Sequence, residues 1–239
     1  MKAIVLAAGS GTRLGPLTAG RPKPLLPIQG KPILEHTLAL LRRHGVTEVL
    51  INLYHCPAAI PAHCGDGRAW GLRITYAVEP ALRGTAGAVK HFETVVGGEE
   101  FLVMYGDNYY DLDLTPLLRF HAATAGVATV GLIEQADVAE SGIADLAPDG
   151  RVRRFVEKPG PGEAFSHWAN AGVYACRPAL FAHLPADRAT DFGRDIFPRL
   201  AAEGVPLFGL VLRGTVLGID TPARYRQAQA ALAGAEAGR

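Results

Sequence analysis

Two cations follow a glycine-rich turn near the start of the chain. The segment Leu6–Leu14 reads LAAGSGTRL, so that Gly9 and Gly11 precede Arg13, and Lys23 follows between two prolines. Glycines carry no Cβ and let backbone N–H groups approach a phosphate closely. Arginine binds phosphate oxygens as a bidentate fork, and lysine supplies a compact positive charge. These residue types in this order predict a site for a polyphosphate.

Two other interpretations of this turn need to be weighed. A strand followed by Gly-x-Gly also opens dinucleotide-binding folds. Here, however, Leu14 occupies the place of the third glycine, and residues 15–27 contain four prolines, so that no helix N-terminus directly follows to receive a pyrophosphate. A nicotinamide-binding dehydrogenase is therefore disfavoured. A solvated basic loop does not explain why both cations follow a glycine turn at the carboxyl end of a strand, where α/β folds bind ligands.

Two aspartates stand at predicted strand ends. Asp107 follows the apolar strand Phe101–Tyr105, and Asp220 follows Leu217–Ile219, just before a helix that starts with Pro222. Carboxylate oxygens suit Mg²⁺, which takes few protein ligands and completes its shell with water and phosphate oxygens. Each aspartate has a simpler alternative role as a cap of a turn or helix. A metal here would fit a reaction in which a phosphate monoester attacks a triphosphate. Because that attack brings two anions together, it needs fixed cations and a metal more than a protein nucleophile.

The elements that position these residues alternate between short apolar runs and amphipathic segments. In the first half we expect strands and helices in alternation, which predicts a mainly parallel sheet with right-handed crossovers; the strands are Ala3–Leu6, Glu48–Leu53, Leu72–Ala77 and Phe101–Tyr105, and the helices are Ile33–His44, Ala86–Val95 and Leu114–Ala125. In the second half we expect mostly strands and a hairpin at Asp149-Gly150, which predict a smaller, partly antiparallel sheet; these strands are Val127–Ile133, Ile143–Leu146, Val152–Val156 and Gly172–Cys176. Helices are predicted at 179–184, 192–203 and 222–236. The predicted fold is an α/β, Rossmann-like three-layer domain with a central mixed, mainly parallel sheet.

Composition excludes several classes of partner. The 239 residues carry a net charge of +1, so no overall field selects nucleic acid or an anionic membrane. The apolar run at the N-terminus is too short for a signal peptide or a membrane span, and three cysteines indicate a reducing, cytoplasmic location. The pairs His55-Cys56 and His63-Cys64 match no common zinc spacing. We interpret that segment as an irregular surface helix.

The stretch LAAGSGTRLGPLTAGRPKPLLP resembles the signature of the sugar nucleotidylyltransferases, which include mannose-1-phosphate guanylyltransferases and glucose-1-phosphate thymidylyltransferases. This resemblance implies a Mg²⁺-dependent, in-line attack of a sugar 1-phosphate on the α-phosphate of a nucleoside triphosphate, which gives an NDP-sugar and pyrophosphate. The catalytic residues would be Arg13, Lys23 and Asp107, with Arg13 supporting the departing pyrophosphate. Asp107 and Asp220 would hold the metal. Family members carry Asp-x-Gly-Thr-Pro at the latter position, whereas here Thr221 follows Asp220 directly.

The resemblance also implies two sets of substrate contacts. The nucleotide-binding residues would be Leu6, Ala8, Gly9, Gly11, Thr12, Arg13, Lys23, Glu79, Gly84, Thr85 and Asp107. The sugar-phosphate-binding residues, carried by the smaller sheet and its neighbours, would be Asn108, Gly142, Glu157, Lys158, Asn170 and Gly172. The alternative for Glu157 and Lys158 is that they form a solvent-exposed ion pair at the end of a hairpin and bind no substrate.

The segment Glu79–Gly87 resembles the loop with which family members recognise the base. Its first residue, Glu79, indicates which base is bound. A carboxylate accepts two hydrogen bonds, and guanine offers adjacent N1–H and N2–H donors, whereas thymine or uracil offers only N3–H. Glu79 therefore favours GTP, with mannose 1-phosphate or a heptose 1-phosphate as the usual partner. Some uridylyltransferases of the family carry a glutamate nearby, and Asn108 is reminiscent of the thymidylyltransferases. A thymidylyl- or uridylyltransferase acting on glucose 1-phosphate or a related sugar phosphate therefore stays open.

The resemblance extends from Met1 to about Tyr225. We expect residues 1–239 to be a single catalytic domain without a C-terminal β-helix, because no hexapeptide repeat follows. The expected partners are small-molecule substrates, with no nucleic acid and no membrane, and a homo-oligomer is open. A non-catalytic regulatory homologue would lack a phosphate cation or a metal carboxylate. Because Arg13, Lys23, Asp107 and Asp220 are all present, that class is disfavoured.

Overall fold

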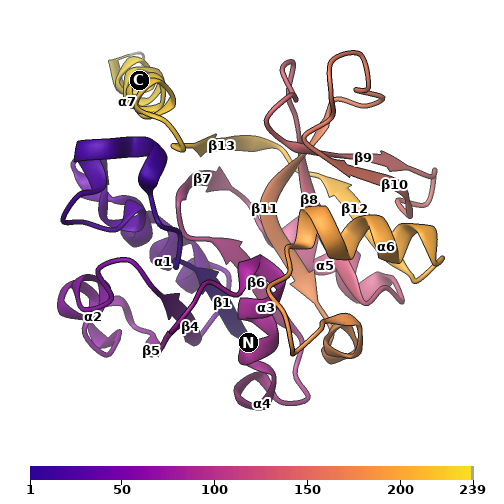
Figure 1. Cartoon of the computed structure of the whole chain (residues 1–239), viewed down its shortest axis with the longest axis horizontal. Coiled ribbons are helices and arrows are strands. Elements are labelled where there is room, and N and C mark those ends of the chain that lie inside the picture. The colour runs from indigo at the N-terminus through magenta and orange to yellow at the C-terminus, as the bar shows by residue number, and fades with distance from the viewer. Residues whose placement is uncertain (238–239) are drawn as a thin grey trace. The chain divides into compact units, whose positions relative to one another are not determined.

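The computed structural model describes residues 1–237, which form an α/β fold with mixed sheet pairing, as the sequence predicts (Figure 1). The chain divides into two compact units. The first consists of Met1–Ile4, Arg83–Met104 and Asp113–Gly214. The second consists of Val5–Leu82, Tyr105–Leu112 and the part of the chain from Thr215 onward. Strand β1 (Lys2–Leu6) runs from the first unit into the second.

The sheet of the first unit is built around β11 (Trp168–Cys176), which is antiparallel to each of its partners. Those partners are β6 (Phe101–Tyr105), β8 (Ala128–Glu134) and β9 (Gly142–Leu146). Strand β10 (Val152–Glu157) is antiparallel to β9, and β12 (Leu207–Val211) is parallel to β8. The predicted hairpin at Asp149-Gly150 is present between β9 and β10.

Two features of this sheet differ from the sequence-based expectation. Strand β11 pairs directly with β6, so the strands of the second half continue the sheet that contains β6 instead of forming a separate smaller one. Smaller sheets do occur elsewhere in the chain, as β2–β3 and β7–β13. Strand β11 also begins at Trp168 instead of Gly172, and its register shifts between Asn170 and Tyr174. Gly172 adopts a φ of 70° there, which a β-bulge requires and a residue with a Cβ resists.

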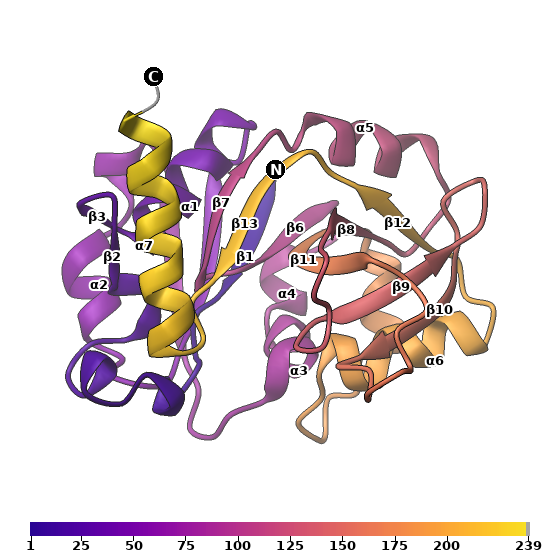
Figure 2. The same cartoon turned by 90° about the horizontal axis from the view of Figure 1, so that it is seen from above.

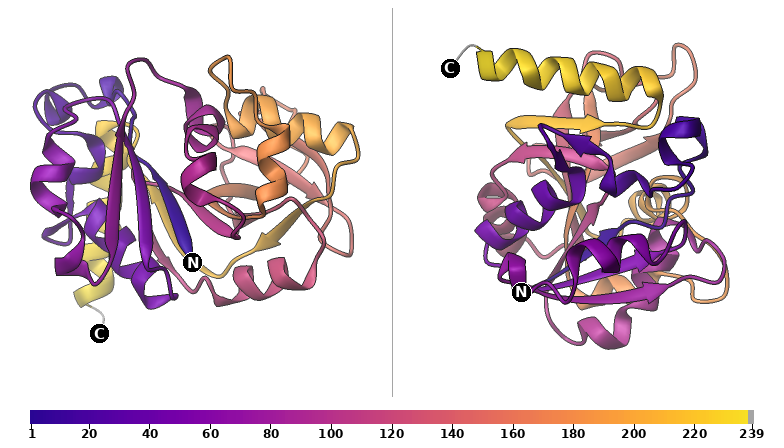
Figure 3. Two further views of the ribbon diagram at one scale, coloured as in Figure 1. Left: turned by 90° about the horizontal axis from the view of Figure 1, so that it is seen from below. Right: turned by 90° about the vertical axis from the view of Figure 1, so that its left-hand side faces the viewer.

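Helices cover both faces of this sheet. Helices α5 (Thr115–Ala123) and α6 (Phe197–Ala202) lie on opposite faces of it (Figures 2 and 3). The expected helix 192–203 divides into a π-helical turn, Phe192–Ile196, and α6, because Pro198 lies in the first turn of α6 and cannot donate a backbone hydrogen bond to the preceding turn. The expected helix 86–95 is likewise two helices, α3 (Gly84–His91) and α4 (Glu93–Val96), which meet at Phe92. The predicted segment 179–184 is a 3₁₀ helix, Pro178–His183.

The second unit carries the glycine-rich turn and both aspartates. Its strands β4 (Glu48–Leu53) and β5 (Arg73–Val78) are parallel and are connected through α2 (Ala59–Cys64). Two small sheets accompany them, formed by β2 (Pro27–Ile28) with β3 (Lys31–Pro32) and by β7 (Asn108–Leu112) with β13 (Gly214–Gly218). Its longer helices are α1 (Ile33–Arg43) and α7 (Pro222–Ala237). Within residues 1–237 no helix has both the length and the apolar character that crossing a membrane would need.

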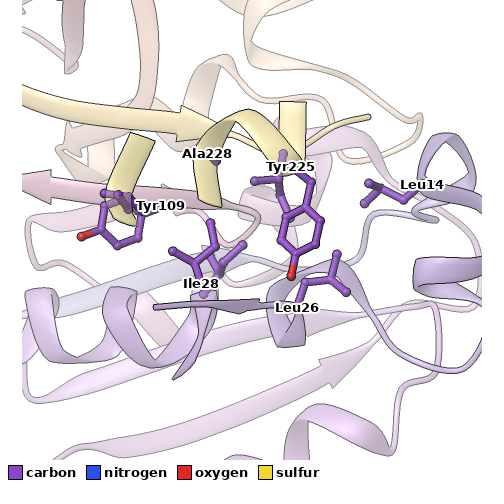
Figure 4. Close-up of a cluster of buried hydrophobic side chains, with 9 residues drawn as sticks. Leu14, Leu26, Ile28, Tyr109, Tyr225 and Ala228 are labelled. Atoms are coloured by element: carbon purple, nitrogen blue, oxygen red, sulfur yellow. The ribbon is translucent and has the colours of Figure 1, made fainter. Parts of the chain in front are cut away.

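Helix α7 is anchored by a buried apolar cluster that also holds the glycine-rich turn. Figure 4 shows Tyr225 and Ala228 of α7 beside Leu14, Leu26 and Ile28, and the right-hand view in Figure 3 shows α7 extending along β13. The hydroxyl of Tyr225 donates a hydrogen bond of 2.6 Å to the carbonyl oxygen of Pro27. This packing fixes the segment next to Arg13 against the helix that follows Asp220.

A buried histidine in the first unit makes stability depend on pH. Burial, and then the nearby charge of Arg177, lower the pKa of His121 to about 4. Its Nδ1 pairs with the Thr129 hydroxyl at 2.8 Å, whereas its Nε2 is buried with no hydrogen-bond partner in the described part of the chain. A protonated ring would therefore bury a charge and an unpaired N–H.

Because the folded pKa of His121 lies below that of a free histidine, the unfolded chain binds more protons between pH 6.5 and about pH 4. We expect the free energy of unfolding to fall by about 3 kcal/mol as the pH drops through this window. Urea unfolding at several pH values measures it. In the variant His121→Gln the free energy of unfolding should no longer fall by this amount between pH 6.5 and about pH 4. In His91→Gln, at an exposed histidine, it should fall as in the unmodified chain. Equal slopes for His121→Gln and the unmodified chain would refute the assignment.

Candidate functional site

A buried lysine joins the two aspartates in the second unit. The Nζ of Lys23 lies 2.7 Å from Asp220 Oδ1 and 3.1 Å from Asp107 Oδ2. The guanidinium of Arg13 lies 3.3 Å from the same oxygen of Asp220. The side chain of Lys23 is 8% exposed, against 53% for Arg13. The lysine is therefore the buried cation of the cluster, and the arginine faces solvent.

Local structure brings the aspartates together from distant parts of the chain. Asp107 directly precedes β7, and Asp220 follows the end of β13. Gly218, the last residue of β13, lies beside the first residue of β7, because a Cβ on it would be 3.5 Å from Asn108 Oδ1. The N–H of Gly106 also donates to the carbonyl oxygen of Leu6 at 2.9 Å. The small β7–β13 sheet and this bond therefore place both carboxylates beside the glycine-rich turn.

The hydrogen bonds nearby argue against the alternative role of Asp107 and Asp220 as caps. Thr221 Oγ1 accepts the N–H of Arg224 at 3.2 Å, so Thr221 caps α7 and Asp220 is left to the cations. Asp113, near Asp107 in the sequence, does act as a cap, because it accepts the N–H of Thr115 at 2.9 Å at the start of α5. The carboxylate of Asp107 instead pairs with Lys23.

The ionisation states in this cluster support one another. Burial lowers the pKa of Lys23, but the negative charges of Asp107 and Asp220 outweigh burial and raise that pKa above its ordinary value. Burial raises the pKa of Asp220, but Lys23, Arg13 and Arg224 outweigh it and hold that pKa below the ordinary range. The lysine is therefore cationic and Asp220 is ionised at neutral pH.

The donor set suits a magnesium ion. Two carboxylates, each with an oxygen within 3.1 Å of the Lys23 nitrogen, lie close together and leave most of a coordination shell for water and phosphate oxygens. Within residues 1–237 no group of three or more His, Cys, Asp or Glu side chains is arranged to hold a metal. A cage made of protein ligands alone, as calcium or structural zinc prefers, is therefore not formed by the described residues.

The glycine-rich turn is shaped by contacts that sequence reasoning missed. Gly11 has a φ of 67°, and its carbonyl oxygen accepts the hydroxyl of Thr18 at 2.9 Å. The carbonyl oxygen of Thr18 in turn pairs with His55 Nε2 at 2.7 Å. Nothing lies within 4 Å of the place where a Cβ of Gly9 would be, so the turn is open on that side. His55 thus supports the turn through Thr18.

The other residues of the second unit that are predicted to bind the nucleotide lie at or just after the ends of strands β1 and β5, or in the glycine-rich turn. Leu6 and Ala8 are buried at and just beyond the end of β1, and Thr12 is exposed at the start of a 3₁₀ segment kinked at Gly15. Glu79, predicted to read the base, is 4% exposed. Its Oε1 accepts Asn52 Nδ2 at 2.8 Å, and Asn52 Oδ1 accepts the N–H of Ala7 at 2.8 Å. Sequence reasoning missed Asn52, although a lone amide in an apolar strand was the available signal.

In the first unit the carboxylate of Glu157 lies close to two glycines. A Cβ on Gly142 would lie 2.5 Å from Glu157 Oε2, and a Cβ on Gly193 would lie closer still. Burial raises the pKa of Glu157, which Lys158 and Arg194 partly counteract and Asp191 reinforces. Lys158 pairs with Glu140 at 2.8 Å. The structure therefore places Gly142 and Gly193 next to the Glu157 carboxylate.

The remaining predicted residues have mostly local partners. Asn170 spans the β-bulge, accepting the N–H of Gly172 and donating to the Tyr174 hydroxyl, both at 2.9 Å. Asn108, in the second unit, donates to the Tyr110 hydroxyl at 3.4 Å. Gly84 and Thr85 begin α3 in the first unit.

The His-Cys pairs have separate partners. His63 pairs with Glu35 at 2.8 Å, while Cys64 is 3% exposed and burial raises its thiol pKa to about 11. His55 contacts Thr18, and Cys56 Sγ lies 3.5 Å from the His55 ring. A neutral, buried thiol is a poor metal ligand.

Comparison with known proteins shows the family to which the chain is similar. The family model described as "Nucleotidyl transferase" matches residues 2–230. The chain is 34% identical to a UTP–glucose-1-phosphate uridylyltransferase of Synechocystis sp., over 88% of this chain and 58% of that protein. It is 34% identical to a mannose-1-phosphate guanylyltransferase of Mycobacterium tuberculosis, over 84% and 56%, respectively. It is 36% identical to an N-acetylmuramate alpha-1-phosphate uridylyltransferase of Neisseria meningitidis, over 98% and 99%.

The chain thus spans little more than half the length of the first two of these relatives and nearly the whole of the third. Among solved structures, a putative glucose-1-phosphate thymidylyltransferase from Bacillus anthracis in complex with a sucrose aligns with a TM-score of 0.87 and 26% identity, covering 96% of this chain and 94% of that one. Because one family model covers nearly all of the sequence, the chain that carries this lysine–aspartate cluster belongs to the nucleotidyl transferase family.

Proposed function

We propose that the protein is a sugar-1-phosphate nucleotidylyltransferase, which converts a nucleoside triphosphate and a sugar 1-phosphate into an NDP-sugar and pyrophosphate. The observation that carries this proposal is the position of Lys23 Nζ between Asp107 and Asp220, with Arg13 on the solvent side of Asp220. The cluster offers fixed positive charge and hard oxygen donors beside an open glycine turn. Its described side chains supply what transfer to a phosphate oxygen needs, without a protein nucleophile.

Each group has a distinct task in this reaction. The N–H groups of the turn around Gly9 and Gly11 bind triphosphate oxygens, because no side chain obstructs the approach at Gly9. Arg13, whose side chain is exposed to solvent on one side of Asp220, neutralises the departing pyrophosphate. Lys23 is buried and held by two carboxylates, so its charge stays near the α-phosphate throughout the displacement.

Asp107 and Asp220 would hold Mg²⁺. The ion, when bound, would supply Lewis-acid stabilisation of the charge on the phosphate oxygens. The carboxylates themselves keep Lys23 protonated and in place. An oxygen of the sugar 1-phosphate attacks the α-phosphorus as the bond to pyrophosphate breaks, and no proton has to move because both phosphates are anionic at neutral pH.

For the base we propose guanine, with mannose 1-phosphate or a heptose 1-phosphate as acceptor. Glu79 supports this choice, because it is a buried carboxylate whose direction is set by the bond to Asn52, and only guanine offers two adjacent donors to such a group. The second candidate is a uridylyl- or thymidylyltransferase acting on glucose 1-phosphate or a related sugar phosphate. The names of the relatives include guanylyl, uridylyl and thymidylyl enzymes.

A panel of ATP, CTP, GTP, UTP and dTTP against several sugar 1-phosphates, scored by pyrophosphate release with Mg²⁺, tests the proposal. We expect release that requires both substrates and is fastest with GTP. The variant Glu79→Gln should lower kcat/KM for GTP by about tenfold or more, because a neutral amide replaces a charged acceptor, and should change UTP much less. Release that is fastest with UTP or dTTP would replace the guanine proposal with the second candidate, and silence across every pair would refute the function.

A further inference from the structure

The segment Thr190–Arg194 of the first unit, here called the 190–194 segment, is bonded to the start of α3. The N–H of Thr190 donates to the carbonyl oxygen of Arg83 at 2.9 Å, and the carbonyl oxygen of Thr190 accepts the N–H groups of Ala86 and Gly87 at 2.9 and 3.2 Å. Gly84 packs so closely on it that a Cβ there would collide with the Thr190 carbonyl oxygen. The backbone of Thr190 therefore fits one position against this loop.

Asp191 completes the contact through its side chain. Its Oδ1 accepts both the N–H and the hydroxyl of Thr85 at 3.2 Å, and the N–H of Phe192 donates to the same hydroxyl at 2.8 Å. The first-turn N–H groups of α3, which have no partner within a helix, are thus satisfied from a segment more than 100 residues away. Arg83, at the N-cap position, makes no such bond with its side chain.

The other end of the 190–194 segment contacts Glu157. The Cα of Gly193 faces the Glu157 carboxylate so closely that no side chain could be accommodated between them. Asp191 and Arg194 both act electrostatically on Glu157, with opposite sign. The backbone between these contacts is a π-helical turn, Phe192–Ile196, a rare geometry that concentrates at functional sites. Phe192 of this turn is fully buried and packs on Tyr174 and Phe197.

We propose that Asp191 is a positioning residue, which fixes the Gly84–Thr85 loop and, through the 190–194 segment, couples that loop to Glu157. The proposal rests on the proposed function and on the roles that the family resemblance implies, in which Gly84 and Thr85 contact the nucleotide and Glu157 contacts the sugar. Because the segment is held at both ends, a displacement at Glu157 on sugar-phosphate binding shifts the bonds to Thr85, Ala86 and Gly87. Occupation of one substrate site thereby changes the affinity of the other.

The test compares steady-state kinetics of Asp191→Ala and Asp191→Asn with those of Asp187→Ala, a control at an exposed aspartate of the preceding loop. Asp191→Ala should raise KM for the nucleotide by about fivefold to tenfold, because loss of a capping acceptor destabilises the start of α3, with a smaller change in kcat. Asp191→Asn keeps an acceptor oxygen and should recover most of the loss. In the unmodified enzyme KM for the nucleotide should depend on the sugar-phosphate concentration, and this dependence should disappear in Asp191→Ala.

Hydrogen exchange supplies a readout that does not need turnover. The amides of Thr85, Ala86 and Gly87 should exchange faster in Asp191→Ala than in Asp187→Ala, and the sugar 1-phosphate alone should slow them only when Asp191 is present. Gly193→Ala tests the other end, and should raise KM for both substrates because its Cβ presses on Glu157.

Three outcomes decide the matter. An active enzyme in which Asp191→Ala shows only a lower melting temperature, with both KM values and the ligand-dependent exchange unchanged, would overturn the coupling. Separate changes, with Gly193→Ala affecting only the sugar phosphate and Asp191→Ala only the nucleotide at every concentration, would overturn it as well. An unmodified enzyme that turns over no pair of substrates would instead refute the proposed function itself.

Discussion

Replacing Lys23 with methionine is expected to lower kcat by about 10²- to 10³-fold, the usual effect of removing one preorganised donor at a site of developing charge. Methionine keeps an apolar stem of similar length in a buried position but removes the charge between Asp107 and Asp220. The two carboxylates remain about 30% exposed, so water can solvate them and the chain should stay folded. Pyrophosphate release under saturating substrates measures kcat, and circular dichroism checks the fold.

Two companion variants sharpen the Lys23 result. Lys31→Met, at an exposed lysine of β3, should leave kcat unchanged. Lys23→Arg should not restore activity, because a planar guanidinium is larger than an ammonium and the lysine nitrogen is enclosed. A folded Lys23→Met protein with near-normal kcat would remove Lys23 from the reaction and leave it as a structural ion pair.

Replacing either aspartate of the cluster with asparagine is expected to lower kcat at least about 10²-fold and to raise the Mg²⁺ concentration needed for half-maximal rate by about tenfold or more. Asparagine keeps the size of the side chain but removes the charge, so the loss reports on the metal and on Lys23 and not on packing. The effect should be larger when both residues are replaced, though not additive, because the two carboxylates share one lysine.

Titration of activity with Mg²⁺ measures this effect. Asp111→Asn, at an exposed aspartate of β7, is the matched control and should keep the Mg²⁺ dependence of the unmodified enzyme. If Asp107→Asn and Asp220→Asn lose rate but retain that dependence, the carboxylates serve only to hold Lys23 and Arg13, and the metal assignment is wrong.

The sequence permitted prediction of those parts of the site that follow strands directly. Asp107 follows an apolar run closely, and Asp220 follows Leu217–Ile219 and stands two residues before the proline that starts a helix, so their places at the carboxyl ends of strands follow from local pattern alone. The glycine turn was predictable for the same reason. That Lys23 lies between the two aspartates was not, because a contact across 197 residues depends on how β7, β13 and α7 pack.

What remained unpredicted depends on tertiary contacts with no local signature. Asp191 accepts the N–H and the hydroxyl of Thr85, 106 residues away, and nothing in its sequence neighbourhood distinguishes it from any aspartate in a loop. The role of Gly193 depends on the side chain opposite it, Glu157. The strands of the second half were recognised one by one, but their continuation of the sheet through β6 is set by a pairing register that alternating hydrophobicity does not specify.

The stereochemical course at the α-phosphorus tests the central claim most directly. A triphosphate with a chiral α-thiophosphate, incubated with the enzyme and a sugar 1-phosphate, should give an NDP-sugar with inverted configuration and one pyrophosphate for each product molecule. Inversion is predicted because the cluster of Arg13, Lys23, Asp107 and Asp220 supports a single in-line displacement without a protein nucleophile. Retention of configuration would require a covalent nucleotidyl-enzyme intermediate and would contradict this account.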